Sequence, residues 1–250
     1  MVQNKISNRF FSEIAWENIS RCTFSISNHV DIWRINISSN LTLLQCLSTV
    51  LTDDELARAA RYIHAHDRDR FIISRGAIKF IMGSYLDRQP LLIEIESGLN
   101  KKPFIKESPL FYNISHSGDW IVLAVSDSEI GIDTEVVNHS FDFNDITTEY
   151  FSPDESRFIN EAKSPDRFFM LWTRKEALIK ATAKGLDDDL KFIPSLDGTH
   201  YLKSNILSFE KNWIVTTFIL FENYFASIAC SDKQNGLRFY ETNLQLMKVQ

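Results

Sequence analysis

The stretch FSPDESRFINEAKSPDRFFMLWTRKEALIKA, residues 151–181, repeats the layout of an earlier one, LTDDELARAARYIHAHDRDRFIISRGAIKFI, residues 51–81. Each opens with a capping box, in which a hydroxyl residue and a glutamate three positions later satisfy each other's backbone donors. The pairs are Thr52 with Glu55, and Ser152 with Glu155. Each stretch then continues into a longer helical pattern. Helix starts often look alike, but the repetition of a whole order of elements favours duplication over coincidence.

The flanking segments extend the repeat. A strand-like segment precedes each stretch, HVDIWRINIS at 29–38 and IGIDTEVV at 130–137, and strand-like segments follow, ending in WIVLAVS and YFASIACS. The order predicts an α+β fold with two similar halves, residues 29–129 and 130–250, each a small sheet packed on a long helix. Residues 1–28 form an N-terminal extension without an assigned role. A cleft between two such halves is a natural ligand site.

Composition narrows the class of protein. The chain has 250 residues, 44% of them hydrophobic, and a net charge of -6, which argues against a general binder of nucleic acid or anionic membranes. The apolar run WIVTTFILF, from Trp213, is too short to cross a bilayer and reads as a core strand. Cys22, Cys46 and Cys230 are scattered, which is typical of reduced thiols. We therefore expect a cytoplasmic protein.

Three carboxylates are the first candidate site residues. Asp133 and Glu135 lie two apart in GIDTEVV, so on a strand they share a face and repel each other unless something positive lies between them. Glu176 and Lys180 lie four apart on the helix predicted over 169–186, which Gly185 would cap. Such a pair is usually an exposed ion pair. Three carboxylates with a lysine are, however, also the parts of a metal-assisted phosphoryl-transfer site, since Mg²⁺ prefers oxygen ligands.

A second group of residues indicates an anion site. Ser115, His116 and Ser117 precede a glycine at the entrance to a strand, a combination suited to holding phosphate, although a lone histidine there is more often structural. Basic residues are frequent between positions 58 and 102, although the protein as a whole is acidic. They include Arg58, Arg61, Arg68, Arg70, Arg75, Lys79, Lys101 and Lys102. Most charge stripes are solvated faces, but this density predicts a local anion site.

The motifs NISHSGDW, IGIDTE and LWTRKEALIKATAKGL, in this order, resemble those of the 4′-phosphopantetheinyl transferases, in their pseudo-dimeric class typified by the surfactin-synthetase activator. The resemblance runs from about residue 51 to about residue 232. It implies transfer of the phosphopantetheine arm of coenzyme A to a serine of an apo acyl or peptidyl carrier protein, with release of adenosine 3′,5′-bisphosphate. It also implies Mg²⁺ as cofactor and a monomer. It does not distinguish fatty-acid, polyketide and nonribosomal-peptide carriers.

The resemblance also implies residue roles. Asp133, Glu135 and Glu176 resemble the Mg²⁺ ligands, and Glu176 also the base for the incoming serine. Lys180 resembles the lysine that assists the leaving group, so Glu176, Lys180 and Asp133 are the implied catalytic residues. The implied coenzyme A contacts are Arg58, Arg75, Lys102, Ser115, His116, Lys175 and Lys180.

Two departures from the family pattern stand out. The family usually has Gly-Lys-Pro where this chain has Lys101-Lys102-Pro103, which affects the adenine edge of the pocket. The family favours isoleucine where Thr134 lies, but Thr134 points away from its acidic neighbours.

Two other functions compete with transfer. A two-metal phosphodiesterase would leave Lys180 and the S-H-S residues unexplained, and a non-catalytic coenzyme A-binding or carrier-binding module would not need all three carboxylates. The carrier itself is expected to dock on residues 136–151, which display Phe141, Phe143, Ile146 and Tyr150.

Overall fold

The computed structural model describes residues 3–162, 164–184, 188–207 and 211–246. The strands are β1 (Gln3–Phe11), β2 (Glu17–Asn18), β3 (Val30–Asn36), β4 (Ile95–Ser97), β5 (Pro103–Ile105), β6 (Phe111–Ser117), β7 (Trp120–Ser126), β8 (Ile130–Val136), β9 (Gly198–Lys203), β10 (Trp213–Phe221), β11 (Tyr224–Ser231) and β12 (Leu237–Glu241). The helices are α1 (Leu44–Ser48), α2 (Asp53–Ala59), α3 (Ala65–Leu86), α4 (Asn144–Tyr150), α5 (Pro153–Glu161), α6 (Asp166–Thr182) and α7 (Ser204–Leu207). Short 3₁₀ segments cover Ile19–Arg21, Ser38–Leu43, Pro90–Leu92, Leu99–Lys101, Asp188–Phe192 and Leu244–Leu246.

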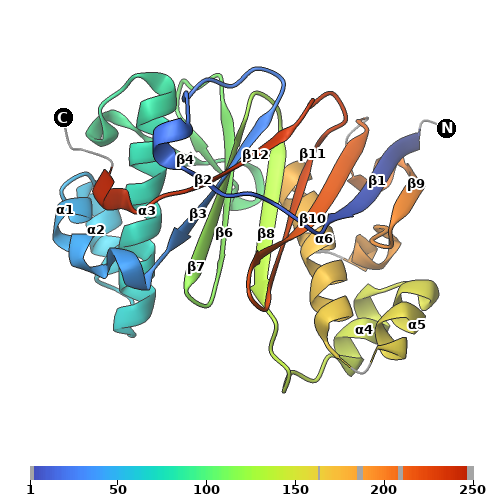
Figure 1. Ribbon diagram of the computed structural model, residues 1–250. Helices are drawn as coiled ribbons and strands as arrows, with labels where there is room; N and C mark the ends of the chain where they lie inside the picture. Colours follow the sequence, from blue (N-terminus) through green and yellow to red (C-terminus); the bar gives the residue numbers. More distant parts are fainter. Residues whose placement is uncertain (1–2, 163, 185–187, 208–210, 247–250) are drawn as a thin grey trace.

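The predicted repeat is present in the topology. One five-stranded sheet has the order β2-β12-β3-β7-β6 and the other β8-β11-β10-β1-β9, so β3-β7-β6 and β8-β11-β10 are equivalent antiparallel units. In each half a strand, a capped short helix, a long helix and a hairpin follow in the same order (Figure 1). Both capping boxes form as predicted, at Thr52 and Ser152.

Alternation along the strands divides the core. Trp33, Ile35 and Leu123 face α3 in one cluster, whereas Ile32 and Val122, the alternate residues, face the other sheet. Beyond the second sheet, Trp213 and Val215 pack against α6. The two sheets therefore pack on each other, and each packs one long helix on its other face. Figure 1 shows α3 beside the first sheet and α6 behind the second. The site described below lies where β6 of the first half meets β8 of the second.

The predicted boundaries of the halves are wrong at both ends of the chain. Residues 1–28 were expected to be an extension, but β1 lies within the second sheet, between β10 and β9, and Ile6 is fully buried. The C-terminal β12 was expected in the second half, yet it pairs with β3 of the first sheet. Figure 1 shows β1 beside β9 in the second sheet and β12 near β2 and β3 in the first. Pairing of strands distant in sequence leaves no local signal, so the repeat alone did not reveal this exchange.

The end of α6 also differs from expectation. The helix ends at Thr182, and Ala183 adopts the left-handed conformation (φ 52°) that usually follows a helix. Gly185, the predicted cap, lies outside the described residues. The strand predicted from WIVTTFILF is β10. No helix in the described part of the chain has the length and apolarity that crossing a membrane requires.

Candidate active site

Two strands bring the acidic residues and the serines together. On β8, Asp133 and Glu135 share a face, as their spacing predicted, and on β6, Ser115 and Ser117 share the face opposite them. The Ser115 hydroxyl donates to Asp133 Oδ1 (2.8 Å) and the Ser117 hydroxyl to Glu135 Oε2 (2.8 Å). Thr134, between the two acids, points away and donates to the carbonyl of Phe225. Because side chains alternate between the faces of a strand, Asp133 and Glu135 form an acidic row on β8, and the two serine hydroxyls of β6 hydrogen-bond to it.

Helix α6 supplies the positive partner. Lys180 Nζ lies 2.6 Å from Asp133 Oδ1 and 3.0 Å from Ser115 Oγ. Glu176 lies one turn earlier on the same helix. Burial, reinforced by the charge of Asp133, raises the pKa of Glu176 to about 7, while Lys180 opposes this rise. Burial and Asp133 also raise the pKa of Glu135. The three carboxylates therefore form a single region of unfavourable negative charge, with one lysine compensating it.

The predicted metal ligands are only partly assembled. Within the described ranges no three carboxylate, imidazole or thiolate groups lie close enough together to hold a metal ion. Lys180 occupies Asp133 Oδ1, so in this structure the lysine is the cation at the acidic row. The donor set nevertheless suits a hard cation. Asp133 Oδ2 is buried without a hydrogen-bond partner, and Glu135 and Glu176 offer carboxylate oxygens beside it.

A basic cavity lies next to the acidic row. It is lined by α2, α3 and β6, with the residues Arg58, Tyr62, Asp67, Arg70, Phe71, Ser74, Arg75, Ile78, Pro103, Ile114 and His116. The guanidinium groups of Arg58 and Arg75 lie over the Phe71 ring, at 5.1 and 5.4 Å from its centroid. Burial lowers the pKa of His116, with smaller contributions from Arg70 and Lys180, so its imidazole is neutral at pH 7. Three guanidinium groups around one concave site make it suited to an anion.

Lys102 lies apart from the three arginines. Its ammonium donates to the carbonyls of Ile130 (2.9 Å) and Ala181 (3.0 Å), and burial lowers its pKa to about 8. It lines a second cavity together with Lys180, and Pro103 and Ile114 line both cavities. The structure therefore brings together Arg58, Arg75 and His116 around one cavity and Lys102 and Lys180 around the next.

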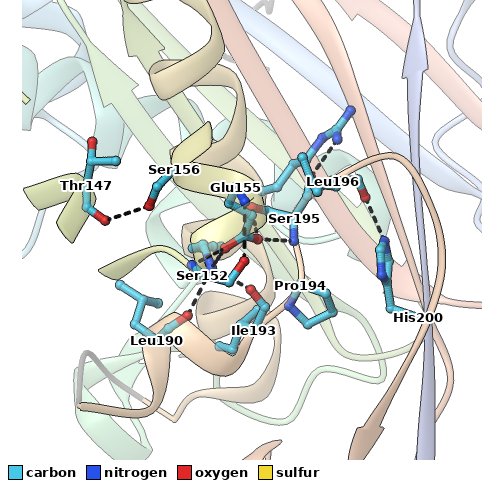
Figure 2. Close-up of polar contacts among 12 residues, drawn as sticks. Thr147, Ser152, Glu155, Ser156, Leu190, Ile193, Pro194, Ser195, Leu196 and His200 are labelled. Atoms are coloured by element: carbon cyan, nitrogen blue, oxygen red, sulfur yellow. Dashed lines mark hydrogen bonds and ion pairs between the residues drawn. The ribbon is translucent and has the colours of Figure 1, made fainter. Parts of the chain in front are cut away.

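The structure gives no support to the implied phosphate contact at Lys175. Its side chain is fully buried, and its ammonium donates to Glu155 Oε2 (3.0 Å), the Leu190 carbonyl (3.1 Å) and the Ile193 carbonyl (2.5 Å). Since an ammonium group has three donors, none remains for a phosphate. Figure 2 shows Glu155 at the centre of this group of contacts, where it also accepts from the Ser195 amide and hydroxyl.

The first half contains the same arrangement. Lys79 on α3 is fully buried, lies 3.3 Å from Oε2 of the capping-box residue Glu55 and donates to the Ile93 carbonyl (3.0 Å). In both halves a buried lysine of the long helix thus links the capping box of the preceding helix to the loop that follows. Its recurrence where no acidic row exists indicates that Lys175 has a structural role.

Residues 136–151, on which a carrier protein was expected to dock, are partly buried in the core and partly exposed. Phe143 stacks on Phe168 with ring centroids 5.1 Å apart, and Ile146 and Tyr150 pack against the same cluster. Phe141 contacts Phe168 and Phe169 but remains 36% exposed. Most of the aromatic bulk in residues 136–151 is therefore core, and α4 forms within the segment.

Comparison with known proteins identifies the family of this chain. Residues 129–229 match the family model described as the 4′-phosphopantetheinyl transferase superfamily, and residues 32–128 match the model described as 4′-phosphopantetheinyl transferase, N-terminal. The chain is 34% identical over 169 residues to the 4′-phosphopantetheinyl transferase HetI of Nostoc sp., covering 64% of this chain and 71% of that protein. The chain belongs to the 4′-phosphopantetheinyl transferase superfamily.

Further relatives carry the same description. A putative 4′-phosphopantetheinyl transferase of Synechocystis sp., slr0495, is 28% identical over 220 residues, or 81% of this chain and 89% of that protein. The 4′-phosphopantetheinyl transferase of Bacillus subtilis is 33% identical over 145 residues, or 56% and 63% of the two chains. The two family models meet at residues 128 and 129, immediately before β8. The acidic row of this transferase therefore lies in the part matched by the superfamily model, and the basic cavity lies mainly in the part matched by the N-terminal model.

Two residues that line this transferase's cavities were given no role of their own from the sequence, although Arg70 was named there among the dense basic residues. Arg70 lines the basic cavity one helical turn before Ser74, whose buried hydroxyl has no partner. That spacing of four was available in the sequence and could have placed Arg70 on the cavity face. Asn100 lines the second cavity from the β4–β5 loop, and no spacing rule connects that loop to α6.

Proposed function

We propose that this chain transfers the 4′-phosphopantetheine arm of coenzyme A to a serine of an apo carrier protein through the acidic row and Lys180, with the basic cavity holding the nucleotide end. The observation that carries the proposal is the position of Lys180. It lies on Asp133, one turn from Glu176, and it also lines the cavity that adjoins the arginines. A pyrophosphate placed there would meet the lysine, and the nucleotide phosphate would meet the guanidinium groups.

Asp133, Glu135 and Glu176 would hold Mg²⁺, which when bound would neutralise charge on the pyrophosphate. The protein's own groups account for the remaining chemistry. In the reaction, the serine oxygen forms a bond to the β-phosphorus, and the bond from that phosphorus to the bridging oxygen breaks, releasing adenosine 3′,5′-bisphosphate. Lys180 would stabilise the negative charge on the departing phosphate.

Glu176 is the proposed acceptor of the serine proton. In the metal-free protein, burial and the neighbouring carboxylates raise its pKa to about 7. A bound Mg²⁺ would favour the ionised carboxylate, which is the form that accepts a proton. Ser115 acts indirectly, because its hydroxyl is committed to Asp133 and accepts from Lys180. We assign it to positioning of these two groups.

The partners follow from the same site. Phe141 is an exposed aromatic side chain in the segment that leaves β8, which supports carrier docking beside the acidic row. Both halves of the site come from one chain, which supports a monomer. The three cysteines are free thiols, which supports a reducing, cytoplasmic setting.

The test is the intact mass of apo acyl and peptidyl carrier proteins incubated with the enzyme, coenzyme A and Mg²⁺. A gain of one phosphopantetheine arm on the carrier, absent with Glu176→Ala, is the expected result. Coenzyme A hydrolysis without any carrier would favour a phosphodiesterase, and binding without either reaction would favour a non-catalytic module.

A further inference from the structure

The loop between β4 and β5 reaches from the first half to the end of α6 in the second. Asn100 Nδ2 donates to the carbonyls of Ala183 (2.7 Å) and Lys184 (2.8 Å). Both partners are acceptors, so the amide nitrogen of Asn100 must face them. Carbonyls at a helix C-terminus lack intrahelical donors, and Asn100 supplies what the helix itself cannot.

Lys102 makes the second contact from this loop. Its ammonium joins the carbonyl of Ile130, the first residue of β8, to that of Ala181 on α6. Ile130 lies three residues before Asp133, and Ala181 directly follows Lys180. A cation at a helix C-terminus also interacts favourably with the helix dipole. The loop therefore binds both elements that carry the acidic row and its lysine.

The backbone of the loop is unusual in a way that serves these contacts. Asn100 (φ 48°) and Lys101 (φ 63°) are consecutive left-handed residues, a conformation that asparagine tolerates and lysine adopts at an energetic cost. The turn keeps its shape here without glycine, and that shape directs the Asn100 amide toward α6.

We propose that Asn100 is a positioning residue and that, with Lys102, it clamps the C-terminal end of α6 so that Lys180 and Glu176 face the acidic row. The proposal rests on the function proposed above, because only that function makes the orientation of α6 matter for turnover. In this view the first half contributes to catalysis through alignment as well as through binding of the nucleotide. Misplacement of reacting groups by about 1 Å can lower rates on the order of a hundredfold.

The test compares two glycine substitutions at adjacent left-handed positions. Asn100→Gly removes the amide, whereas Lys101→Gly changes the same turn and leaves the amide in place. Carrier modification gives kcat and KM, and hydrogen-exchange mass spectrometry reports protection of α6 peptides covering residues 171–184, with α3 as internal reference. We expect Asn100→Gly to lower kcat roughly tenfold, with a smaller change in KM for coenzyme A, and to lose protection in α6 alone.

Lys101→Gly should keep the wild-type α6 protection, because the Asn100 amide stays in place. Asn100→Gly with wild-type kcat and α6 protection would overturn the proposal, as would equal losses of α6 protection in both variants, since the turn rather than the amide would then be responsible. If the wild-type enzyme modifies no carrier, the proposed function fails, and the exchange data alone decide whether the clamp exists.

Discussion

Two lysines of α6 that look equivalent in the sequence lie in different surroundings. Lys175 is fully buried with all three donors used, whereas the Lys180 side chain is 29% exposed and faces Asp133 and a cavity. Helical geometry explains the difference, because residues five apart point about 140° away from each other. The side chain that contacts Asp133 is therefore the one available to a phosphate.

Lys175→Ala is expected to destabilise the fold. It leaves the buried Glu155 carboxylate without its cation, and breaking a buried pair in this way costs about 3–5 kcal/mol. Urea unfolding measures the loss. Lys180→Ala should instead lower transfer at least about a hundredfold in a folded protein. If Lys175→Ala keeps the wild-type stability but loses transfer, Lys175 contacts the phosphate after all.

Glu176→Gln tests the raised pKa of Glu176 in metal-free protein. The folded pKa, about 7, exceeds the ordinary value of 4.5, so ionised Glu176 costs stability above pH 7, and the cost disappears as the pH falls toward 4.5. The variant should therefore gain stability relative to wild type at pH 8, on the order of 2 kcal/mol, and nothing near pH 4.5. Chelator-treated samples unfolded in urea across this range supply the measurement. A difference that does not change with pH would contradict the assignment.

Arg70→Ala tests the basic cavity. If Arg70 contacts the 3′-phosphate, the wild-type preference for coenzyme A over 3′-dephospho-coenzyme A should shrink by roughly ten- to a hundredfold, the size of a charge-assisted contact. The ratio of kcat/KM for the two substrates is the readout. Arg157, an exposed arginine of α5, is the matched control, because Arg157→Ala should leave the ratio unchanged. An unchanged ratio in Arg70→Ala would place the phosphate elsewhere.

At the scale of elements, the contact of α6 with β8 decides how the site is assembled. A Cβ on Gly131 would lie 2.1 Å from the Ala177 carbonyl oxygen and 2.2 Å from the Ala181 amide nitrogen. Both are backbone atoms, so helix and strand meet with no room for a side chain. This close approach places Lys180 within hydrogen-bonding distance of Asp133.

Gly131→Ala should therefore separate α6 from β8. We expect a loss of about 1–3 kcal/mol from overpacking, together with loss of transfer because Glu176 and Lys180 move away from the acidic row. Thermal unfolding and carrier modification measure the two effects. Gly236→Ala is the control, since a Cβ there meets nothing within 4 Å. Equal behaviour of the two variants would show that the close approach is not essential.

At the scale of the whole molecule, the ends of the chain connect the halves. β1 pairs with β10 and β9 in the second sheet, while β12 returns to pair with β3 and β2 in the first. The apolar cluster between the sheets draws on β3 and β7 from one and β8, β10 and β11 from the other. Neither half therefore has a complete core of its own.

Unfolding should accordingly be a single transition. Ile6→Ala, a change in β1, should lower the free energy of unfolding by about 2–5 kcal/mol. Far-UV circular dichroism reports the helices and strands of both halves, and tryptophan fluorescence reports Trp33 in the first sheet and Trp213 in the second. Both signals should shift to the same lower midpoint. Two separated transitions would show that the halves unfold independently.

The sequence determined what depends on local spacing and residue chemistry. The two capping boxes, the repeated order of elements, the shared face of Asp133 and Glu135, and the role of β10 as a core strand all follow from periodicity within a few residues. The motifs along β6, β8 and α6 also predicted the family. These three short motifs were sufficient to predict the family, because the spacing within each motif decides which of its side chains share a face.

Only the tertiary structure decided which of these residues act together. It buried Lys175 and left Lys180 beside Asp133, brought Asn100 to the end of α6, and exchanged β1 and β12 between the sheets. Each of these results depends on contacts between residues far apart in the chain. Such contacts are fixed by packing of whole elements, as at Gly131, and leave no periodic trace in the sequence.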